Sequence, residues 1–132
     1  MKLTDLAIGD LILINNTPHK IQAIDSIDAE ILADDELYYV GEDRCHSEDK
    51  IEGIPITLEI LEKNGFIKVN SQRYDYGHPD TDCYVKVNPK KNMIHVNGRN
   101  ANSNLYSHSF VHELQRALRC CGLWDIADDF KV

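Results

Sequence analysis

The hydrophobic pattern of the chain changes at Ile54-Pro55-Ile56, and this change constrains the fold more than any other feature. Before it, short apolar runs are separated by Gly, Asn and Asp at intervals of roughly ten residues, which is typical of a small barrel or curled meander. After it, helix-capping residues flank a set of alternating strands. The pattern therefore predicts an α+β protein in which a β module over residues 1–53 packs on a second module over residues 54–132 as one compact unit.

The first module is predicted to consist of short strands joined by tight turns. Asn15-Asn16 follows the first strand and indicates a hairpin turn, because Asn tolerates the left-handed backbone region. The last two strands are expected to pair around Asp34-Asp35, and residues 41–52 are expected to form an acidic surface loop. The predicted strands cover residues 11–14, 19–25, 29–32 and 37–40.

The second module is predicted to begin and end with a helix. Thr57 is a suitable N-cap for a helix over residues 58–64, and Gly65 stands where a left-handed residue ends a helix. The final helix is expected to have its cap at Ser109, to carry apolar residues at helical spacing and to end at Gly122.

Three alternating strands are predicted between these helices, over residues 66–69, 83–87 and 93–96, which gives the order αβββα. Period-two alternation places one face of each strand in the core. Residues 71–82 are expected to form a loop or an irregular hairpin around Gly77-His78-Pro79, and residues 97–104 are expected to form a loop. The residues expected to point inward are Ile67, Val69, Cys83, Val85, Val87, Ile94 and Val96, and those expected to point outward are Lys68, Tyr84, Lys86 and His95.

Composition favours a soluble cytoplasmic protein. The hydrophobic fraction of 42% and the charged fraction of 27% are ordinary for a globular domain. The start of the chain lacks the basic and apolar regions of a secretory signal, and no stretch approaches the roughly 18 apolar residues of a membrane-spanning helix. The four cysteines show no C-x-x-C spacing, so reduced thiols are expected. No cofactor is predicted. The chain has neither a Gly-rich phosphate loop nor the G-x-S-x-G elbow that carries a catalytic serine.

The segment HELQR, which begins at His112, comes within one residue of the zinc-protease motif H-E-x-x-H. That motif works because two histidines four residues apart bind zinc from one helix face, while the glutamate acts as general base. Arg116 replaces the second histidine here, and its permanent positive charge repels a metal ion. The chain is therefore expected not to be an enzyme. Gln115 and Arg119 of this helix are expected to face solvent.

His108 and His112 are the remaining candidates for a metal site, because they too are four residues apart. They would chelate a metal only if the helix began before Ser107, and the cap expected at Ser109 argues against that register. No metal is predicted, and a metal-dependent hydrolase with a degenerate H-E-x-x-H helix is kept as an alternative.

A second candidate surface lies on the outward face of the predicted strands, where residues 83–99 contain no acidic residue. Aromatic rings between cations on a sheet can stack bases and neutralise phosphates, so nucleic acid is an alternative ligand. The residues of this candidate nucleic-acid face are Lys68, Tyr84, Lys86, His95 and Arg99.

The net charge of −8 is unevenly divided between the two modules. Residues 1–53 hold thirteen acids and four bases, a net charge of −9, whereas residues 54–132 hold nine acids and ten bases, a net charge of +1. Such an asymmetry suggests surfaces with different partners, and the acidic half is suited to a basic partner that otherwise binds nucleic acid. A partner protein is therefore the expected ligand. The candidate partner-binding residues are Tyr38, Tyr39, Glu42 and Asp43.

Two segments of the second module, IPITLEILEKNGF from Ile54 and VHELQRALR from Val111, resemble small uncharacterised proteins of gut bacteria and their prophages. The resemblance implies a bacterial, phage- or mobile-element context without an established activity. Members often carry histidine at the position of Arg116, so the departure in this chain implies that the helix has a use other than metal binding.

The pattern Leu6-x-Ile8-Gly9-Asp10-x-Ile12, followed by Ile21-x-x-Ile24, is similar to the opening of SH3-like and KOW-type barrels. This resemblance implies a five-stranded barrel that contacts proteins or nucleic acids, and the fold alone does not choose between them. We therefore expect an SH3-like barrel packed on an αβββα module, acting as a non-enzymatic interaction module. The oligomeric state is not predicted.

Overall fold

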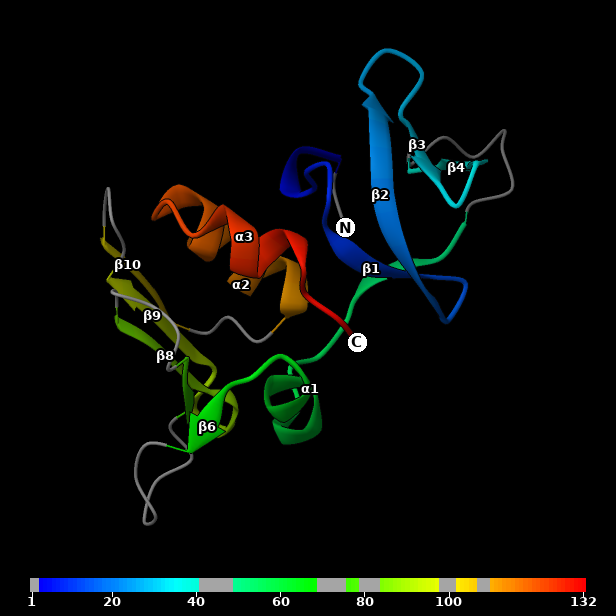
Figure 1. The fold of residues 1–132 in the computed structure, drawn as a ribbon. Helices are drawn as coiled ribbons and strands as arrows, with labels where there is room; N and C mark the ends of the chain where they lie inside the picture. Colours follow the sequence, from blue (N-terminus) through cyan, green and yellow to red (C-terminus); the bar gives the residue numbers. More distant parts are fainter. Residues whose placement is uncertain (1–2, 41–48, 69–75, 79–83, 98–101, 107–109) are drawn as a thin grey trace. The chain divides into compact units, whose positions relative to one another are not determined.

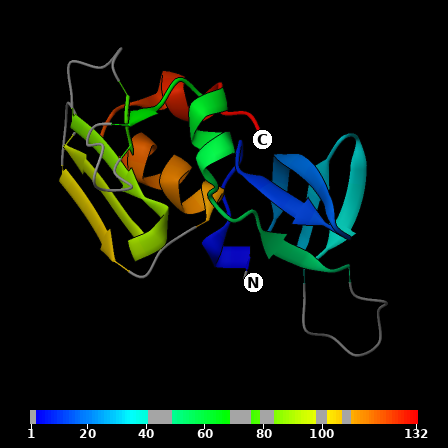
Figure 2. The same ribbon diagram turned by 90° about the horizontal axis from the view of Figure 1, so that it is seen from below.

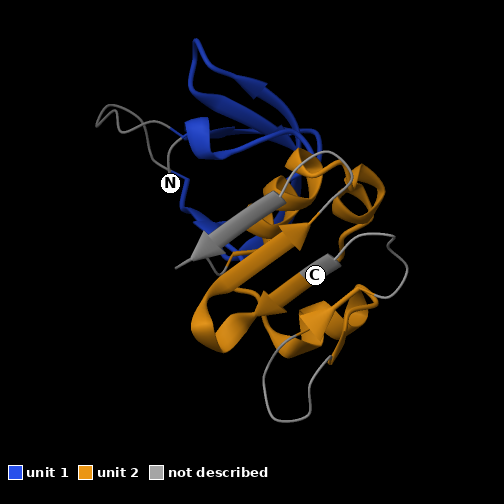
Figure 3. Ribbon diagram, turned by 90° about the vertical axis from the view of Figure 1, so that its left-hand side faces the viewer, with its two compact units in different colours: residues 1–54 blue, residues 55–132 orange. Residues whose placement is uncertain are grey.

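The computed structural model describes residues 3–40, 49–68, 76–78, 84–97, 102–106 and 110–132, with the backbone alone at 84–85 and 102–106. The chain divides into two compact units, Met1–Ile54 and Pro55–Val132, which Figure 3 colours separately. The described part consists of two antiparallel sheets and short helices, so the predicted α+β class is confirmed. None of the helices in these ranges has the length and apolar character needed to span a lipid bilayer.

The N-terminal unit is a five-stranded antiparallel sheet preceded by a short 3-10 helix, η1 (Leu3–Asp5). Four strands form a meander and the fifth returns beside the first, in the order β4-β3-β2-β1-β5 (Figure 1). Within the described ranges no pairing joins β4 to β5, so the sheet is open and the predicted closed barrel stays a prediction. The strands are β1 (Leu11–Ile14), β2 (Thr17–Asp25), β3 (Glu30–Ala33), β4 (Glu36–Tyr39) and β5 (Ile51–Gly53).

Two tight turns set the register of this sheet. The φ angles are 49° and 68° at Asn15 and Asn16, and 49° and 62° at Asp34 and Asp35. Two successive left-handed residues are the signature of a type I′ hairpin turn, for which Asn and Asp are favoured. The hairpin predicted at Asn15-Asn16 is therefore confirmed, and the turn at Asp34-Asp35 joins β3 to β4 in the same way.

The core of the N-terminal unit is built from inward-facing aliphatic residues, and a bulge in β2 shapes it. Ile21 pairs with Ala33 whereas Ala23 pairs with Leu32, so Gln22 is an extra residue on β2. A bulge of this kind bends the strand and increases its twist. The buried core residues are Leu6, Ile12, Ile14, Ile21, Ile31 and Ala33.

The C-terminal unit has a second five-stranded antiparallel sheet, in the order β10-β9-β8-β7-β6. Figure 2 shows helix α2 against one face of this sheet, where the Cys121 Sγ lies 3.7 Å from the Val96 carbonyl oxygen. The elements are α1 (Leu58–Lys63), β6 (Ile67–Lys68), β7 (Tyr76–Gly77), β8 (Tyr84–Asn88), η2 (Pro89–Lys91), β9 (Met93–Asn97), β10 (Asn102–Tyr106), α2 (Val111–Cys120) and α3 (Trp124–Asp128).

The predicted order αβββα is incomplete. β7 lies in the segment predicted to be a loop or an irregular hairpin, β10 begins in the segment predicted to be a loop, and α3 follows α2. The asparagine-rich composition of β10 disfavours a strand, but β10 pairs with β9 over its full length, from Asn102 opposite Asn97 to Tyr106 opposite Met93. Tertiary pairing therefore overrides local propensity here.

Helix α1 has the predicted cap at each end. The Thr57 hydroxyl accepts a hydrogen bond from the Ile60 N–H at 3.2 Å. At the other end the Gly65 N–H donates to the Glu62 carbonyl and the Phe66 N–H donates to the Leu61 carbonyl, at 3.1 and 3.0 Å. These two bonds form a Schellman motif, which requires the left-handed φ of 83° at Gly65.

The inward orientation predicted for Ile67 of β6 is wrong, whereas Lys68 is exposed, as predicted. Ile67 is 55% exposed and pairs with Gly77, which pairs with Lys86 of the outer face. The reason is Phe66, which is 2% exposed because the end of α1 directs it into the core. Once Phe66 points inward, Ile67 must point outward, since successive side chains of an extended segment face opposite sides.

Of the other residues predicted to point inward, three are buried and three have side chains outside the described part of the chain. Val87, Ile94 and Val96 are buried, as predicted. Val69 and Cys83, and the side chain of Val85, lie outside the described residues.

Helix α2 buries more of its circumference than predicted. Gln115 and Arg119 were expected to face solvent, but their exposed fractions are 1% and 7%. The Gln115 Nε2 donates to the Ala127 carbonyl at 3.0 Å, and the Arg119 Nε lies 3.8 Å from the Asp128 Oδ1. Helix α3 supplies both partners, so the flank of α2 predicted to face water packs against α3.

The beginning of α2 also differs from the prediction. The expected cap, Ser109, lies outside the described residues, and the first helical residue is Val111. The Phe110 N–H donates to the Glu113 Oε1 at 3.1 Å, which is one half of a capping box.

The cap at Gly65 gives a direct test of how α1 ends. A Cβ at this position would lie 3.4 Å from the His78 Nε2, an ordinary contact, so the cost of a side chain is conformational. We expect Gly65→Ala to lower the free energy of unfolding by about 1–2 kcal/mol. Gly65→Asn should lower the free energy of unfolding by a smaller amount, because Asn tolerates a left-handed conformation. Urea unfolding of both variants measures the difference, and equal losses would contradict this explanation.

Candidate functional site

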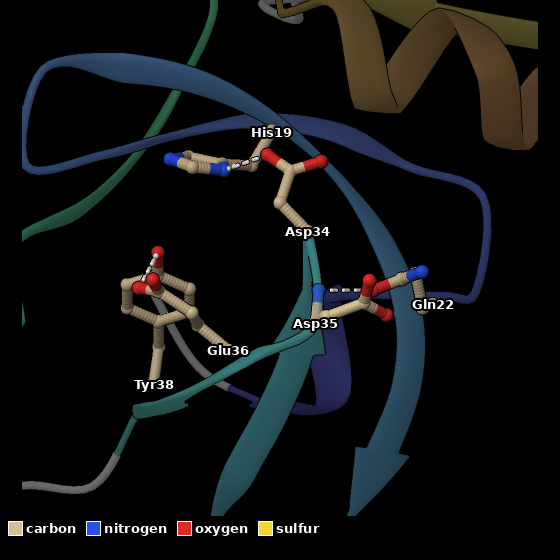
Figure 4. A network of polar contacts seen from close by, with 6 residues as sticks. All are labelled: His19, Gln22, Asp34, Asp35, Glu36 and Tyr38. Carbon is tan, nitrogen blue, oxygen red and sulfur yellow. Dashed lines mark hydrogen bonds and ion pairs between the residues drawn. The ribbon is translucent and has the colours of Figure 1, made fainter.

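The turn between β3 and β4 carries a run of three exposed acids, Asp34, Asp35 and Glu36. The predicted partner-binding residues Tyr38 and Tyr39 follow on β4 and are both half-buried. The other two predicted residues, Glu42 and Asp43, lie outside the described residues. Figure 4 shows the polar contacts around the turn. They involve five residues that were not among the predicted site residues, namely His19, Gln22, Asp34, Asp35 and Glu36.

His19 connects the turn to β2. Its Nδ1 contacts the Oδ2 of Asp34, and its ring centroid lies 5.5 Å from that of Tyr38 at an interplanar angle of 50°. The His19 side chain is only 13% exposed, whereas that of Asp34 is 65% exposed. The imidazole therefore holds the Asp34 carboxylate in place from the protein side and leaves most of that carboxylate accessible to solvent.

Tyr38 and Glu36 lie on the same face of β4 and are joined directly. The Tyr38 hydroxyl donates to the Glu36 Oε2 at 3.0 Å. Partial burial raises the pKa of the Tyr38 hydroxyl above its usual value, and the hydrogen bond to Glu36 and the negative charges of Glu36, Asp34 and Asp49 act in the same direction. Tyr38 is therefore a neutral hydrogen-bond donor and an aromatic surface, and it is unsuited to act as a nucleophile.

The bulge in β2 anchors the second acid of the turn. The Asp35 N–H donates to the Gln22 Oε1 at 2.9 Å. Gln22 is the extra residue that the bulge adds to β2, so the bulge supplies the side chain that holds the backbone of the turn (Figure 4). We call the set His19, Asp34, Asp35, Glu36 and Tyr38 the acidic turn.

A separate carboxylate, Asp49, ties the end of β4 to the first hairpin. Its Oδ2 accepts from the Tyr39 N–H and its Oδ1 accepts from the Asn15 Nδ2, both at 3.1 Å. Asn15 is in turn paired with the backbone of Lys50 through two hydrogen bonds of 2.8 and 2.9 Å. Asp49, which lies just before β5, therefore connects this edge of the sheet to β4 at the other edge, where the described residues show no strand pairing.

The chemistry open to the acidic turn is recognition of positive charge. Its three carboxylates are exposed, so binding a cationic group carries a small desolvation cost. Within the described ranges no group of three His, Cys, Asp or Glu side chains has the arrangement of a metal site.

The predicted nucleic-acid face is assembled only in part. Lys86 and His95 are directly opposite each other on β8 and β9, and both are half-buried. Lys68 pairs with Tyr76, which pairs with the buried Val87, so Lys68 belongs to the opposite face of the sheet. The Tyr84 side chain and all of Arg99 lie outside the described residues.

The HELQR segment lies on α2, with His112 7% exposed. The His112 ring stacks on Phe110, with centroids 5.9 Å apart and an interplanar angle of 16°. Glu113 accepts the hydrogen bond that caps the helix, and Arg116 is exposed. The second metal candidate, His108, lies outside the described residues. His112 and Glu113 thus take part in the packing and capping of the helix.

A small polar pocket of about 310 Å³ lies in the C-terminal unit beside the end of α1. Two of its lining residues are joined directly, since the Asn64 side chain makes two hydrogen bonds of 2.7 Å with the backbone of Lys131. Its lining includes both basic and acidic side chains, so the pocket does not present one sign of charge. Its lining residues are Lys63, Asn64, His78, Asp125, Ile126, Asp129 and Lys131.

No protein-family model, curated protein or solved structure matches the chain. The assignment of a function therefore depends on the chemistry of the described residues.

The raised pKa of Tyr38 predicts the effect of removing its neighbour. Glu36→Gln removes one of the charges that raise this pKa and weakens the acceptor of the Tyr38 hydroxyl, so the pKa of Tyr38 should fall toward its usual value. A pH titration of the Tyr38 ring followed by NMR measures it. Glu52→Gln, which removes the same charge from β5, is the matched control and should leave the pKa of Tyr38 unchanged. An unchanged pKa in Glu36→Gln would refute the described contact.

Proposed function

We propose that the chain is a non-enzymatic interaction module whose N-terminal unit binds a basic partner protein through the acidic turn. The observation that carries the proposal is the local anchoring of three consecutive exposed acids. His19 contacts Asp34, Gln22 accepts from the Asp35 N–H, and Tyr38 donates to Glu36. Each acid therefore has a fixed position while its charge remains accessible.

Pre-organisation and charge support binding in different ways. A turn that is already ordered loses little conformational entropy when a partner docks, so more of the interaction energy appears as affinity. The net charge of −9 over residues 1–53 attracts a basic partner over a longer range and accelerates association. Tyr38 adds an aromatic ring beside the carboxylates, and such rings attract the cationic groups of Lys and Arg.

An SH3-like character of the N-terminal unit belongs to the same proposal. The strand order β4-β3-β2-β1-β5, in which the last strand returns beside the first, and the bend of β2 at its bulge support it. A bacterial cytoplasmic protein of prophage or mobile-element origin is the setting implied by the resemblance of the ILEKNGF and VHELQ segments, and we include that setting in the proposal.

Selection from a displayed library of random peptides tests the basic-partner proposal. We expect the selected peptides to be rich in Lys and Arg, and their affinity for the double variant Asp34→Asn, Glu36→Gln to be weaker by about tenfold. The control is Glu59→Gln, Glu62→Gln, which removes the same charge from exposed positions of α1. Equal losses in both double variants would show that net charge alone attracts the peptides, and the proposal would fail.

Nucleic acid is the second candidate ligand, favoured by the direct pairing of Lys86 with His95 on one sheet face. Binding to phosphates weakens steeply as salt is added. Under our proposal, single-stranded DNA and RNA oligonucleotides should show no salt-sensitive mobility shift with the purified chain. A shift that is lost in Lys86→Glu and retained in the control Glu62→Lys would favour nucleic acid instead.

A further inference from the structure

β4 forms one edge of the N-terminal sheet, and its backbone groups alternate in direction. The Val40 N–H, just after the strand, donates to the Ala29 carbonyl at 2.8 Å, toward β3. The Tyr39 N–H points the other way and donates to Asp49. Period-two alternation then directs the N–H and C=O of Leu37 away from β3 as well. Among the described residues, neither backbone group of Leu37 has a hydrogen-bond partner.

The side chains of β4 divide between the two faces of the sheet. Leu37 is 66% exposed and lies opposite Leu32. Glu36 and Tyr38 lie opposite Ala33 and Ile31, on the other face, where the His19 ring approaches Tyr38 (Figure 4). The edge therefore presents an open apolar side chain on one face and acidic and aromatic side chains on the other.

We propose that the β4 edge binds an extended peptide of alternating basic and apolar residues by strand addition, with the peptide backbone paired to Leu37. This proposal rests on the proposed function and specifies the partner and its binding mode. Strand addition uses main-chain hydrogen bonds for affinity and alternate side chains for specificity. The central peptide residue would lie beside Leu37 and should be apolar. Its two neighbours would lie beside Glu36 and Tyr38, where Lys or Arg matches the charge and the ring.

Charge identifies the occupant of this edge. A second copy of the chain would bring together two N-terminal halves of net charge −9, which repel each other. A basic strand neutralises that charge instead. The pairing is centred on Leu37 because Asp49 holds the next outward N–H, that of Tyr39. Because the free edge offers the backbone groups of one residue, Leu37, recognition also depends on the alternating side chains of the peptide.

The test uses a synthetic peptide of alternating lysine and valine and measures its affinity for the full chain by NMR titration. Leu37→Pro removes the outward N–H without removing a bond to β3, which is the position where an edge strand tolerates proline. We expect affinity to fall about tenfold in Leu37→Pro and much less in the control Leu37→Ala, which changes the side chain alone. The amide spectrum of each variant shows whether the sheet is intact.

Methylated peptides give a second measurement on the unaltered protein. N-methylation of the central valine blocks the peptide N–H that would donate to the Leu37 carbonyl, and it should abolish binding. N-methylation of an adjacent lysine, whose N–H would point away from β4, should have little effect. Equal affinities of the two methylated peptides would overturn strand addition, as would equal affinities of Leu37→Pro and Leu37→Ala.

The failure of this inference and the failure of the proposed function give different results. If Asp34→Asn, Glu36→Gln weakens the peptide and Leu37→Pro does not, the acidic turn binds through side chains alone and strand addition is wrong. If none of these variants changes the affinity, both proposals are wrong. Sedimentation of the free chain as a dimer that dissociates in Leu37→Pro would assign the edge to a second copy and would also overturn the inference.

Discussion

The register of the N-terminal sheet depends on two turns in which both central residues adopt left-handed backbone conformations, Asn15-Asn16 and Asp34-Asp35. A two-residue turn of this type fixes which residues face each other on the flanking strands, and a shift by one residue would exchange the two faces. The second turn matters most for the proposed function, because the residues that tolerate its geometry are also acids. A single backbone requirement therefore both closes the hairpin and places two carboxylates at its tip.

Grouping like charges at one turn has a cost that the surrounding residues offset. Neighbouring carboxylates repel each other, and solvent screens that repulsion only in part. His19 contributes a partner for Asp34, and Gln22 holds the backbone of Asp35 from the bulge in β2. The proposed site therefore depends on the irregular strand, since the bulge in β2 supplies the Gln22 side chain that accepts from the Asp35 N–H.

Local signals predicted much of the fold and little of the site. Thr57 and Gly65 identify the ends of α1 because capping depends on the residues at those positions and their immediate neighbours. The phase of β6 could not be predicted from alternation alone, because the buried Phe66 before it sets which way Ile67 points. The burial of Gln115 could not be predicted from the periodicity of α2, because its partner is on α3. His19 and Asp34 are fifteen residues apart, and only the pairing of β2 with β3 brings them together.

The most direct test of the central claim is an NMR map of the amide groups that shift when a basic peptide selected by the chain is added. If the acidic turn is the binding surface, the largest shifts will fall at residues 34–38 and at His19 and Gln22, and they will diminish in Asp34→Asn, Glu36→Gln. Shifts concentrated at residues 84–97 of the C-terminal sheet, with residues 34–38 unchanged, would contradict it.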